Sequence, residues 1–450
     1  MRTSTSHLTS YQDKQAALLA SWSQEPGQLR LEKSTISNLF RYQGRNTPTR
    51  RLPLGAFNEI IALDAEARTL EVEGLATFET IVSTSLQHGF LPLVAPELKH
   101  ITVGGATVGI GIESTCFRHG FVHDGLLEAD VLLPGGTVVT CRPDNEHADL
   151  FAALANSYGT LGYILRAKIA LTPAAPYVRI RIACFDDAPS YLDAMQAATE
   201  RGTADFIEGL FFQDRRYYLM CGHFASEVPQ LDDILRENIF YRLVQQRSDI
   251  YLSTTDYIFR YDPEWFWNIP DSWQYRLFRR YAPKAWRNSS FYTRYAAAKN
   301  RLKKTLTGTA ATDLEPLIQD WEVPWEHAEE LVTFCLEHVD LGDRPWAAVP
   351  IRTPRQPTLY PIEADKLYFN LGSYCQVTRP VGREPYYYTK IMDEKCFELG
   401  GIKMLYSSTF LSEAEFNARF NGDAYHRLKE KYDASGSAPT LYAKVSLAAT

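Results

Sequence analysis

The sequence predicts an α+β protein, in which strands and helices mix without strict alternation. Three features of the 450-residue chain lead to this prediction. Short stretches alternate between apolar and polar residues with the period of a half-buried strand. The stretch from Ile101 to Ser114 places four glycines among β-branched residues. After Pro173 and Pro176 the pattern changes, and a second region of mixed strands and helices begins.

The first region begins with a polar segment and a short helix expected around Lys14 to Ser21. Alternation of Thr69, Glu71 and Glu73 with apolar neighbours then predicts a strand that pairs with the one before it. The elements expected in this region are strands at Ile60–Asp64 and Thr69–Glu73, a helix at Phe78–Gln87 that ends at Gly89, a hairpin of Leu126–Leu133 and Thr137–Cys141 around Pro134-Gly-Gly136, a helix at Asp149–Leu154 and a strand at Ile164–Leu171.

The second region runs from residue 177 to about residue 399 and contains a long aromatic and basic segment. Its expected strands are Val178–Phe185, Phe206–Phe212, Tyr217–Phe224, Trp346–Ile351 and Lys366–Gly372, followed by a helix at Glu384–Glu398. Mixed elements of this kind are typical of an α+β substrate domain.

Composition limits the class of function. A hydrophobic content of 45% and a charged content of 22% are those of a globular protein with a sizeable core. The net charge of −7 argues against nucleic-acid binding. The seven cysteines include no C-x-x-C pair, which favours reduced thiols over a disulfide framework or a metal site. The N-terminus is polar and no apolar window approaches 18 residues, so we expect a cytoplasmic protein.

The glycine-rich stretch is the strongest functional signal. Gly104, Gly105, Gly109 and Gly111 stand in apolar surroundings, where glycine is costly unless the backbone turns sharply or a ligand approaches it closely. Bare backbone N–H groups of such a segment favour the pyrophosphate of a large flat cofactor. The alternative is a tight turn in a buried sheet.

A family resemblance appears when the motifs are taken in order. Thr102-Val-Gly-Gly105, the Leu-Leu-Pro-Gly-Gly136 hairpin, Asp149-Leu-Phe and Gly159-Thr-Leu-Gly-Tyr-Ile164 resemble the FAD-binding (PCMH-type) domain of the vanillyl-alcohol-oxidase superfamily. Met404-Leu-Tyr-Ser407 and the stretch from Glu413 to Leu428 are similar to the delta(24)-sterol reductases within that superfamily. The resemblance runs from about Glu32 to Lys444 and is weakest between Ser190 and Asp340.

The resemblance implies a fold in which the FAD-binding domain has two parts and a substrate (cap) domain is inserted between them. We expect residues 1–175 to form the first part of the FAD-binding domain and residues 176–399 the α+β substrate domain. Residues 400–450 would return to the FAD and the active site.

The resemblance also implies an activity: hydride moves from NADPH through FAD to a carbon–carbon double bond of a sterol or other lipid-like substrate. One alternative is an FAD-dependent oxidase or dehydrogenase of a lipid or sugar alcohol, like the decaprenylphosphoryl-ribose oxidases. Thr409 counts against the sugar oxidase, because those enzymes look to carry an essential lysine there. Another alternative is a flavin- or lipid-binding protein without catalysis.

The cofactor-binding residues follow from the same resemblance. The first pyrophosphate segment would be Ser34 to Arg41, with Ser37, Asn38 and Arg41 as ligands, and its lack of a histidine implies non-covalent FAD. The remaining expected contacts are Thr102, Val103, Gly104, Gly105, Gly109, Gly111, Ile112, Ser114, Gly159, Gly162 and Ile164.

The catalytic candidates are Glu113, Tyr406, His119 and His123. Glu113 directly follows the glycines and could relay a proton, hold the substrate or bond the cofactor. Histidine titrates near neutral pH, although a lone histidine is more often structural. Tyr406 could pack on the flavin ring or be a core aromatic. Asn370 and Lys403 are the candidate substrate contacts.

The segment between residues 265 and 304 combines aromatic and basic side chains. Residues 276–304 contain ten Lys or Arg and no acid, and Trp265, Trp267, Trp273 and Trp286 lie within or just before this run. This combination suits the interface between anionic headgroups and acyl chains, which predicts a peripheral membrane contact. A solvated helix face beside a buried aromatic cluster is the alternative, and the composition leaves the oligomeric state open.

Overall fold

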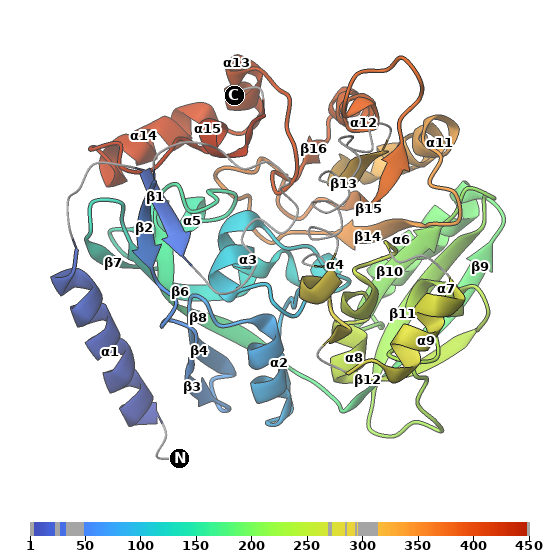
Figure 1. Cartoon of the computed structure of the whole chain (residues 1–450), viewed down its shortest axis with the longest axis horizontal. Coiled ribbons are helices and arrows are strands. Elements are labelled where there is room, and N and C mark those ends of the chain that lie inside the picture. Colours follow the sequence, from blue (N-terminus) through green and yellow to red (C-terminus); the bar gives the residue numbers. More distant parts are fainter. Residues whose placement is uncertain are drawn as a thin grey trace.

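The computed structural model describes residues 4–22, 28–32, 49–268, 272–283, 286–292, 295 and 314–447 of the chain. Within these residues the chain forms a six-stranded N-terminal sheet, an eight-stranded central sheet and a separate parallel pair of strands. Figure 1 shows the two large sheets on opposite sides of the molecule, with α3 (Val103–Gly109) between them. The predicted α+β class is confirmed by this mixture of antiparallel sheets and helices.

The N-terminal sheet contains the strands that alternation predicted. Its strand order is β3-β4-β8-β6-β7, with β5 paired to β8 at one end. The strands are β3 (Ile60–Asp64), β4 (Thr69–Glu73), β5 (Phe90–Pro92), β6 (Leu126–Leu132), β7 (Val138–Cys141) and β8 (Tyr163–Pro173). The parallel pair is β1 (Gln28–Glu32) and β2 (Thr49–Pro53).

The central sheet is antiparallel and has the order β12-β9-β11-β10-β14-β15-β13-β16. Its strands are β9 (Tyr177–Phe185), β10 (Phe206–Phe211), β11 (Tyr217–Ala225), β12 (Asp249–Ser253), β13 (Leu314–Pro324), β14 (Trp346–Ile351), β15 (Tyr368–Thr378) and β16 (Ile402–Lys403). β13 and β15 form the longest pairing, from Leu314 opposite Thr378 to Pro324 opposite Tyr368.

Helices cover both sheets. They are α1 (Ser4–Ala20), α2 (Phe78–Leu86), α4 (Cys116–His119), α5 (Ala148–Ala153), α6 (Ala188–Arg201), α7 (Phe240–Val244), α8 (Thr254–Ile258), α9 (Trp273–Tyr281), α11 (Ala328–His338), α12 (Tyr387–Glu398), α13 (Glu413–Arg419), α14 (Gly422–Tyr432) and α15 (Leu441–Val445). Local sequence explains several ends: Asp187 caps α6 through the Ser190 N–H, and Gly202 ends it with a φ of 60°.

The C-terminal helices return to the N-terminal half of the molecule. Figure 1 shows α14 and α15 beside β1, β2 and α5. The Tyr432 hydroxyl and the Lys431 ammonium both bond the Asp149 carboxylate of α5, each at 2.7 Å. The Tyr425 hydroxyl lies 3.0 Å from the Thr160 hydroxyl, in the turn before β8. These contacts join sequence segments almost 300 residues apart, whereas the expected division into domains at residues 175 and 399 stays a prediction.

Candidate functional site

A cavity of about 420 Å³ lies where α3, the N-terminal sheet, the central sheet and the C-terminal segment meet. Its volume is in the range of small-molecule and cofactor sites, which is about 300–1,000 Å³. The lining residues come from distant parts of the sequence, from Leu31 near the start to Lys444 near the end. The cavity therefore exists only in the folded chain.

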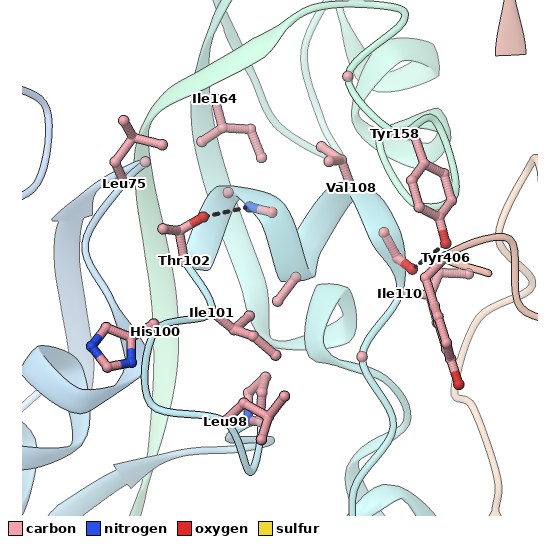
Figure 2. Close-up of a pocket in the computed structure, with 18 of the residues that line it drawn as sticks. Leu75, Leu98, His100, Ile101, Thr102, Val108, Ile110, Tyr158, Ile164 and Tyr406 are labelled. Atoms are coloured by element: carbon pink, nitrogen blue, oxygen red, sulfur yellow. Dashed lines mark hydrogen bonds between the residues drawn. The ribbon is translucent and has the colours of Figure 1, made fainter. Parts of the chain in front are cut away.

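The glycine-rich stretch forms one wall of this cavity, and much of it is the short helix α3, which the sequence did not predict. The Thr102 hydroxyl accepts a hydrogen bond from the Gly105 N–H at 3.3 Å and caps α3 (Figure 2). Helical geometry is possible despite the glycines because the helix packs tightly: the Gly104 N–H donates to the Gly74 carbonyl at 2.9 Å. A Cβ on Gly104 would lie 2.8 Å from that carbonyl oxygen, so this glycine permits close packing.

Two other glycines face open space. A Cβ on Gly105 would meet only the Thr102 hydroxyl, at 3.0 Å, and a Cβ on Gly109 would meet only the Tyr158 ring, at 3.6 Å. The Tyr158 hydroxyl donates to the Gly109 carbonyl at 3.0 Å and so holds its ring over the end of α3 (Figure 2). Gly105 and Gly109 thus let a ligand approach the backbone of α3.

Glu113 lies on the cavity wall after α3 and belongs to a buried acidic cluster. Its carboxylate accepts a hydrogen bond from the Glu97 N–H at 2.8 Å. The Glu97 carboxylate is bonded by the Arg260 guanidinium, which also pairs with Glu208. Within the described residues, Glu113 makes no ion pair of its own, although its side chain is only 8% exposed.

The cluster contains three carboxyls and a single guanidinium, so its members cannot all be charged at low cost. Burial, and then the nearby Glu97 charge, raise the pKa of Glu113 well above its ordinary value. Burial also raises the pKa of Glu97, although the Arg260 charge opposes that shift. Because Arg260 stabilises the charge on Glu97 directly, Glu113 is the carboxyl that retains a proton at neutral pH.

Tyr406 belongs to a second polar cluster, which centres on Asp320 of β13. The Asp320 carboxylate accepts hydrogen bonds from the Tyr406 hydroxyl at 2.6 Å, the Tyr374 hydroxyl at 2.7 Å and the Asn370 amide at 3.0 Å. Burial raises the pKa of Asp320, and these three donors oppose the shift. Asp320, Tyr374 and Tyr406 line the cavity, whereas Asn370 is buried behind Asp320.

The other predicted catalytic and substrate residues lie outside this cavity. His119 lines a smaller cavity behind Glu113. His123 is stacked on Phe121, with its Nε2 3.9 Å from the Asp124 carboxylate. Lys403 is fully buried and donates to Asp393 at 2.6 Å and to the Ser408 carbonyl at 2.8 Å. His123 and Lys403 are therefore held by contacts inside the protein, away from the large cavity.

The predicted cofactor contacts divide in the same way. Those that line the cavity are Thr102, Gly104, Gly105, Gly109, Gly111, Ile112, Gly159, Gly162 and Ile164. Val103 is buried in the core, and the Ser114 hydroxyl lies 3.1 Å from the Tyr257 hydroxyl, towards the smaller cavity. Ser37, Asn38 and Arg41 fall outside the described residues.

Several lining residues were not predicted from the sequence. They are Glu97, His100, Phe266, Asp320 and Tyr374. Glu97 and His100 stand within the proline-flanked approach to α3, and their nearness to the glycines was a usable signal. Phe266 stacks on Tyr374 with 4.1 Å between the ring centroids. Phe266 and Asp320 come from the least recognisable part of the chain, and they reach the cavity through Tyr374, which bonds Asp320 of the paired strand β13 and stacks on Phe266.

Comparison with known proteins identifies the N-terminal part. Residues 36–142 match the family model of the FAD binding domain. The chain is 26% identical over 410 residues to the delta(24)-sterol reductase of Homo sapiens, covering 87% of this chain and 77% of the relative. It is 25% identical over 437 residues to the enzyme of that name from Arabidopsis thaliana, with 87% and 75% covered. It is also 34% identical over 144 residues to cytokinin dehydrogenase 7 of Oryza sativa subsp. japonica, with 31% and 27% covered.

The cavity residues fit a bound FAD. Gly105 and Gly109 leave space that a side chain would occupy, next to an apolar wall that includes Val108. The Nδ1 atom of His100 is buried in the cavity lining and has no hydrogen-bond partner in the described part of the chain, so it is free to bond a ligand. The chain therefore contains a PCMH-type FAD-binding domain, found in FAD-linked oxidoreductases, and is similar to delta(24)-sterol reductases over most of its length.

Proposed function

We propose that this protein reduces a carbon–carbon double bond of a sterol or another lipid-like substrate, with hydride supplied by NADPH and carried by non-covalently bound FAD. The similarity to delta(24)-sterol reductases over 87% of the chain supports this reaction class. The observation that carries the proposal is the buried Glu113 carboxyl on the wall of the candidate cofactor cavity. A non-covalent FAD agrees with the lack of histidine between Ser34 and Arg41.

The reaction divides between cofactor and protein. When bound, FAD supplies hydride transfer, which side chains cannot perform. An isolated double bond also needs a proton: the π bond breaks, one carbon receives the hydride and the other receives the proton. Glu113 holds that proton on its carboxyl, since Glu97 and Arg260 leave it as the neutral member of the cluster.

The other side chains of the cavity orient the reactants and exclude water. The Tyr406 hydroxyl donates a hydrogen bond to the Asp320 carboxylate, which fixes the orientation of the Tyr406 ring on the cavity wall. Apolar side chains form much of the remaining wall, which suits a lipid-like substrate and disfavours water beside the reacting atoms. They include Leu75, Leu98, Ile101, Val108, Ile110 and Phe266.

We also infer that α9 contacts an anionic lipid surface from which such a substrate can enter. Trp273, Leu277 and Tyr281 lie four residues apart on this helix and are 68%, 48% and 75% exposed. Arg276 and Arg280 on the same helix are exposed as well. Exposed aromatic and aliphatic side chains beside arginines suit a headgroup–acyl boundary.

The basic aromatic segment also contains buried residues, which cannot contact a lipid surface. Trp265 and Trp267 are buried in the core, Arg279 pairs with Glu264 at 3.1 Å, and Arg287 donates to the Leu235 carbonyl at 2.8 Å. These four residues are therefore structural. Within the described residues, no helix combines the length and the hydrophobicity needed to cross a bilayer.

An anaerobic absorbance experiment tests the proposed reaction. The purified protein should show the flavin spectrum, NADPH should bleach it, and a delta(24)-sterol should restore it. The Glu113→Gln variant should still bind FAD and be bleached by NADPH, but restoration by the sterol should slow at least about tenfold, within the usual contribution of a general acid. Restoration at an unchanged rate would remove Glu113 from the mechanism.

The same experiment separates the alternatives. The similarity to cytokinin dehydrogenase 7 keeps open a reaction in the opposite direction, in which an oxidisable substrate bleaches the flavin and NADPH does not. A protein that stays colourless after addition of FAD would instead support a lipid-binding role without catalysis.

A further inference from the structure

A second, smaller cavity of about 50 Å³ lies behind Glu113. Glu113 lines both cavities, so its carboxyl forms part of the wall between them. The same wall contains the ion pair of Glu97, which faces the large cavity, with Arg260, which faces the small one. The small cavity has room for about three water molecules, since one water needs roughly 10–15 Å³ of this volume.

The small cavity runs from the protein surface to the buried cluster. Its outer residues are exposed and include Arg118 and Pro173. The Arg118 guanidinium donates to the Ala204 carbonyl at 2.7 Å and lies 3.6 Å from the Asp205 carboxylate, so this end of the cavity is polar and held in place. Its inner residues include Arg260, which is 1% exposed.

We propose that this small cavity is a proton inlet that recharges Glu113 from solvent, on the side opposite the bound cofactor and substrate. The inference rests on the proposed function for its purpose. In each turnover a carboxyl O–H bond of Glu113 breaks and a C–H bond of the product forms, which leaves a carboxylate. A proton from solvent then forms a new O–H bond on that carboxylate, so the net reaction consumes one hydride from NADPH and one proton from water.

A proton route through the small cavity is needed because the cofactor and the substrate fill the large cavity. When FAD and a lipid-like substrate occupy the large cavity, water can reach Glu113 from that side only by displacing them. Ile110 and Ile112, which precede Glu113 in the lining of that side, have apolar side chains that cannot carry a proton. With a volume of about 50 Å³, the small cavity is too small to admit either the cofactor or the substrate, so neither of them blocks it.

His119 has the position and charge expected of a group along such an inlet. It lines the small cavity and is half-buried. Burial, assisted by the neighbouring Arg118 charge, lowers its pKa to about 4. The neutral imidazole at pH 7 can accept and pass on a proton without placing a fixed positive charge in the passage. The Ser114 hydroxyl and its partner Tyr257 extend the polar lining at the inner end.

Hydrogen–deuterium exchange of the Glu113 proton tests the inlet without turnover. The infrared carbonyl band of a protonated buried carboxyl shifts in D₂O, and the band missing from Glu113→Gln identifies Glu113. Its exchange would be followed in the FAD-loaded protein and in variants that narrow the inlet from two elements, Ala95→Leu and Thr172→Phe. Both residues line the small cavity and not the large one. Thr137→Phe, at an exposed hairpin position, is the matched control for Thr172→Phe.

We expect exchange to slow about tenfold or more in both narrowed variants, because the proton then waits for local opening of the structure. Leu93→Ala, which widens the same cavity, should accelerate it, and Thr137→Phe should leave it unchanged. The inference would be overturned if the exchange rate of the Glu113 proton were the same in all these variants but lower with FAD bound than without it. That result would place the proton route on the cofactor side. If the narrowed variants slow the exchange but the protein does not reduce a sterol, only the proposed reaction would be overturned.

Discussion

At the scale of single residues, the site depends on how buried carboxylates are paired. Glu113 and Glu97 are close neighbours, yet only Glu97 has a guanidinium partner. Asp320 is stabilised differently, by three neutral donors. A carboxylate with enough donors can stay charged when buried, whereas one without them keeps its proton. The pairing therefore assigns a proton-holding role to Glu113 and a positioning role to Asp320.

Replacing Tyr406 by Phe should destabilise the fold through Asp320. The variant removes one of the three donors to a buried carboxylate, and a hydrogen bond to a charged group contributes about 1.5–3 kcal/mol. Urea denaturation should show a loss of that size in the free energy of unfolding. Tyr442→Phe is the control, because its hydroxyl donates only to the Leu411 carbonyl at 3.3 Å. An equal loss in both variants would contradict the role given to Asp320.

Replacing Gly109 by Leu should prevent FAD binding without unfolding the protein. A Cβ at this position has ordinary contact with the Tyr158 ring, at 3.6 Å, and the rest of a leucine would extend into the cavity. The purified variant should lack the visible flavin absorbance and keep its thermal transition. Gly135→Leu, in the exposed hairpin turn with no atom within 4 Å of its Cβ, should bind FAD normally. A yellow Gly109→Leu protein would mean that the cofactor lies elsewhere.

At the scale of elements, α9 illustrates a helix with two different faces. Its buried side is fixed by Arg279, whose guanidinium pairs with Glu264 and bonds the Ile234 carbonyl at 2.7 Å. Its outer side presents a stripe of large apolar residues that no described element covers. Such a stripe is unusual on a monomer surface and is typical of an interaction site.

A double variant of this stripe should lose lipid binding. Vesicles with anionic lipid should sediment the wild-type protein at low salt, and added salt should release it, because arginine attraction to the surface is screened. Trp273→Ser with Leu277→Ser removes apolar contact and should weaken binding about tenfold or more, since burying one such side chain contributes about 1.5–3 kcal/mol. The control Val381→Ser changes a fully exposed valine before α12. No sedimentation of the wild-type protein would refute the contact.

At the scale of the whole molecule, the cavity unites segments that are distant in the sequence. Its wall draws on Leu31, the α3 region, Phe266, Asp320 and Tyr406. The two large sheets share one apolar core, which extends from Leu70 of β4 to Val445 of α15. Burying several carboxyl groups together lowers the stability of the folded state by an amount that depends on pH.

The free energy of unfolding should fall as pH rises from about 6.5 to 8. Burial raises the pKa of Glu264 to about 8 and the pKa of Glu113 well above its ordinary value, so both keep protons in the folded state that the unfolded chain loses above about pH 4.5. The folded state is then disfavoured by ~1 kcal/mol per pH unit for each retained proton. His119 and His123, whose pKa values are lowered by burial, titrate below this range.

Urea denaturation at pH 6.5, 7.2 and 8 measures this slope. Glu264→Gln removes one of the two titrating groups and should flatten it, whatever its effect on stability at a single pH. Glu330→Gln changes an exposed carboxyl and should leave the slope as it is. A free energy of unfolding that rises with pH over this interval would contradict the proposed protonation states.

Local patterns predicted much of the secondary structure. Alternation identified β4 to the residue, its predicted partner β3 also has the expected bounds, and the proline and glycine turn signals located the β6–β7 hairpin. The helical form of the glycine-rich segment at α3 was missed because glycines seldom favour a helix. Close contact with Gly74 and the Thr102 cap decide its conformation, and the first of these depends on the folded sheet.

The sequence by itself determined the α+β class, the glycine-rich cofactor segment and the nomination of Glu113 and Tyr406. The first two and Glu113 rest on local residue type and spacing, whereas Tyr406 rests on the resemblance of its stretch to the delta(24)-sterol reductases. The tertiary structure alone placed Asp320 behind Tyr406, and it paired Arg260 with Glu97 and Glu208. It also opened a small cavity behind Glu113. A carboxyl's protonation and its access to solvent depend on neighbours from distant strands, and no local pattern in the chain records them.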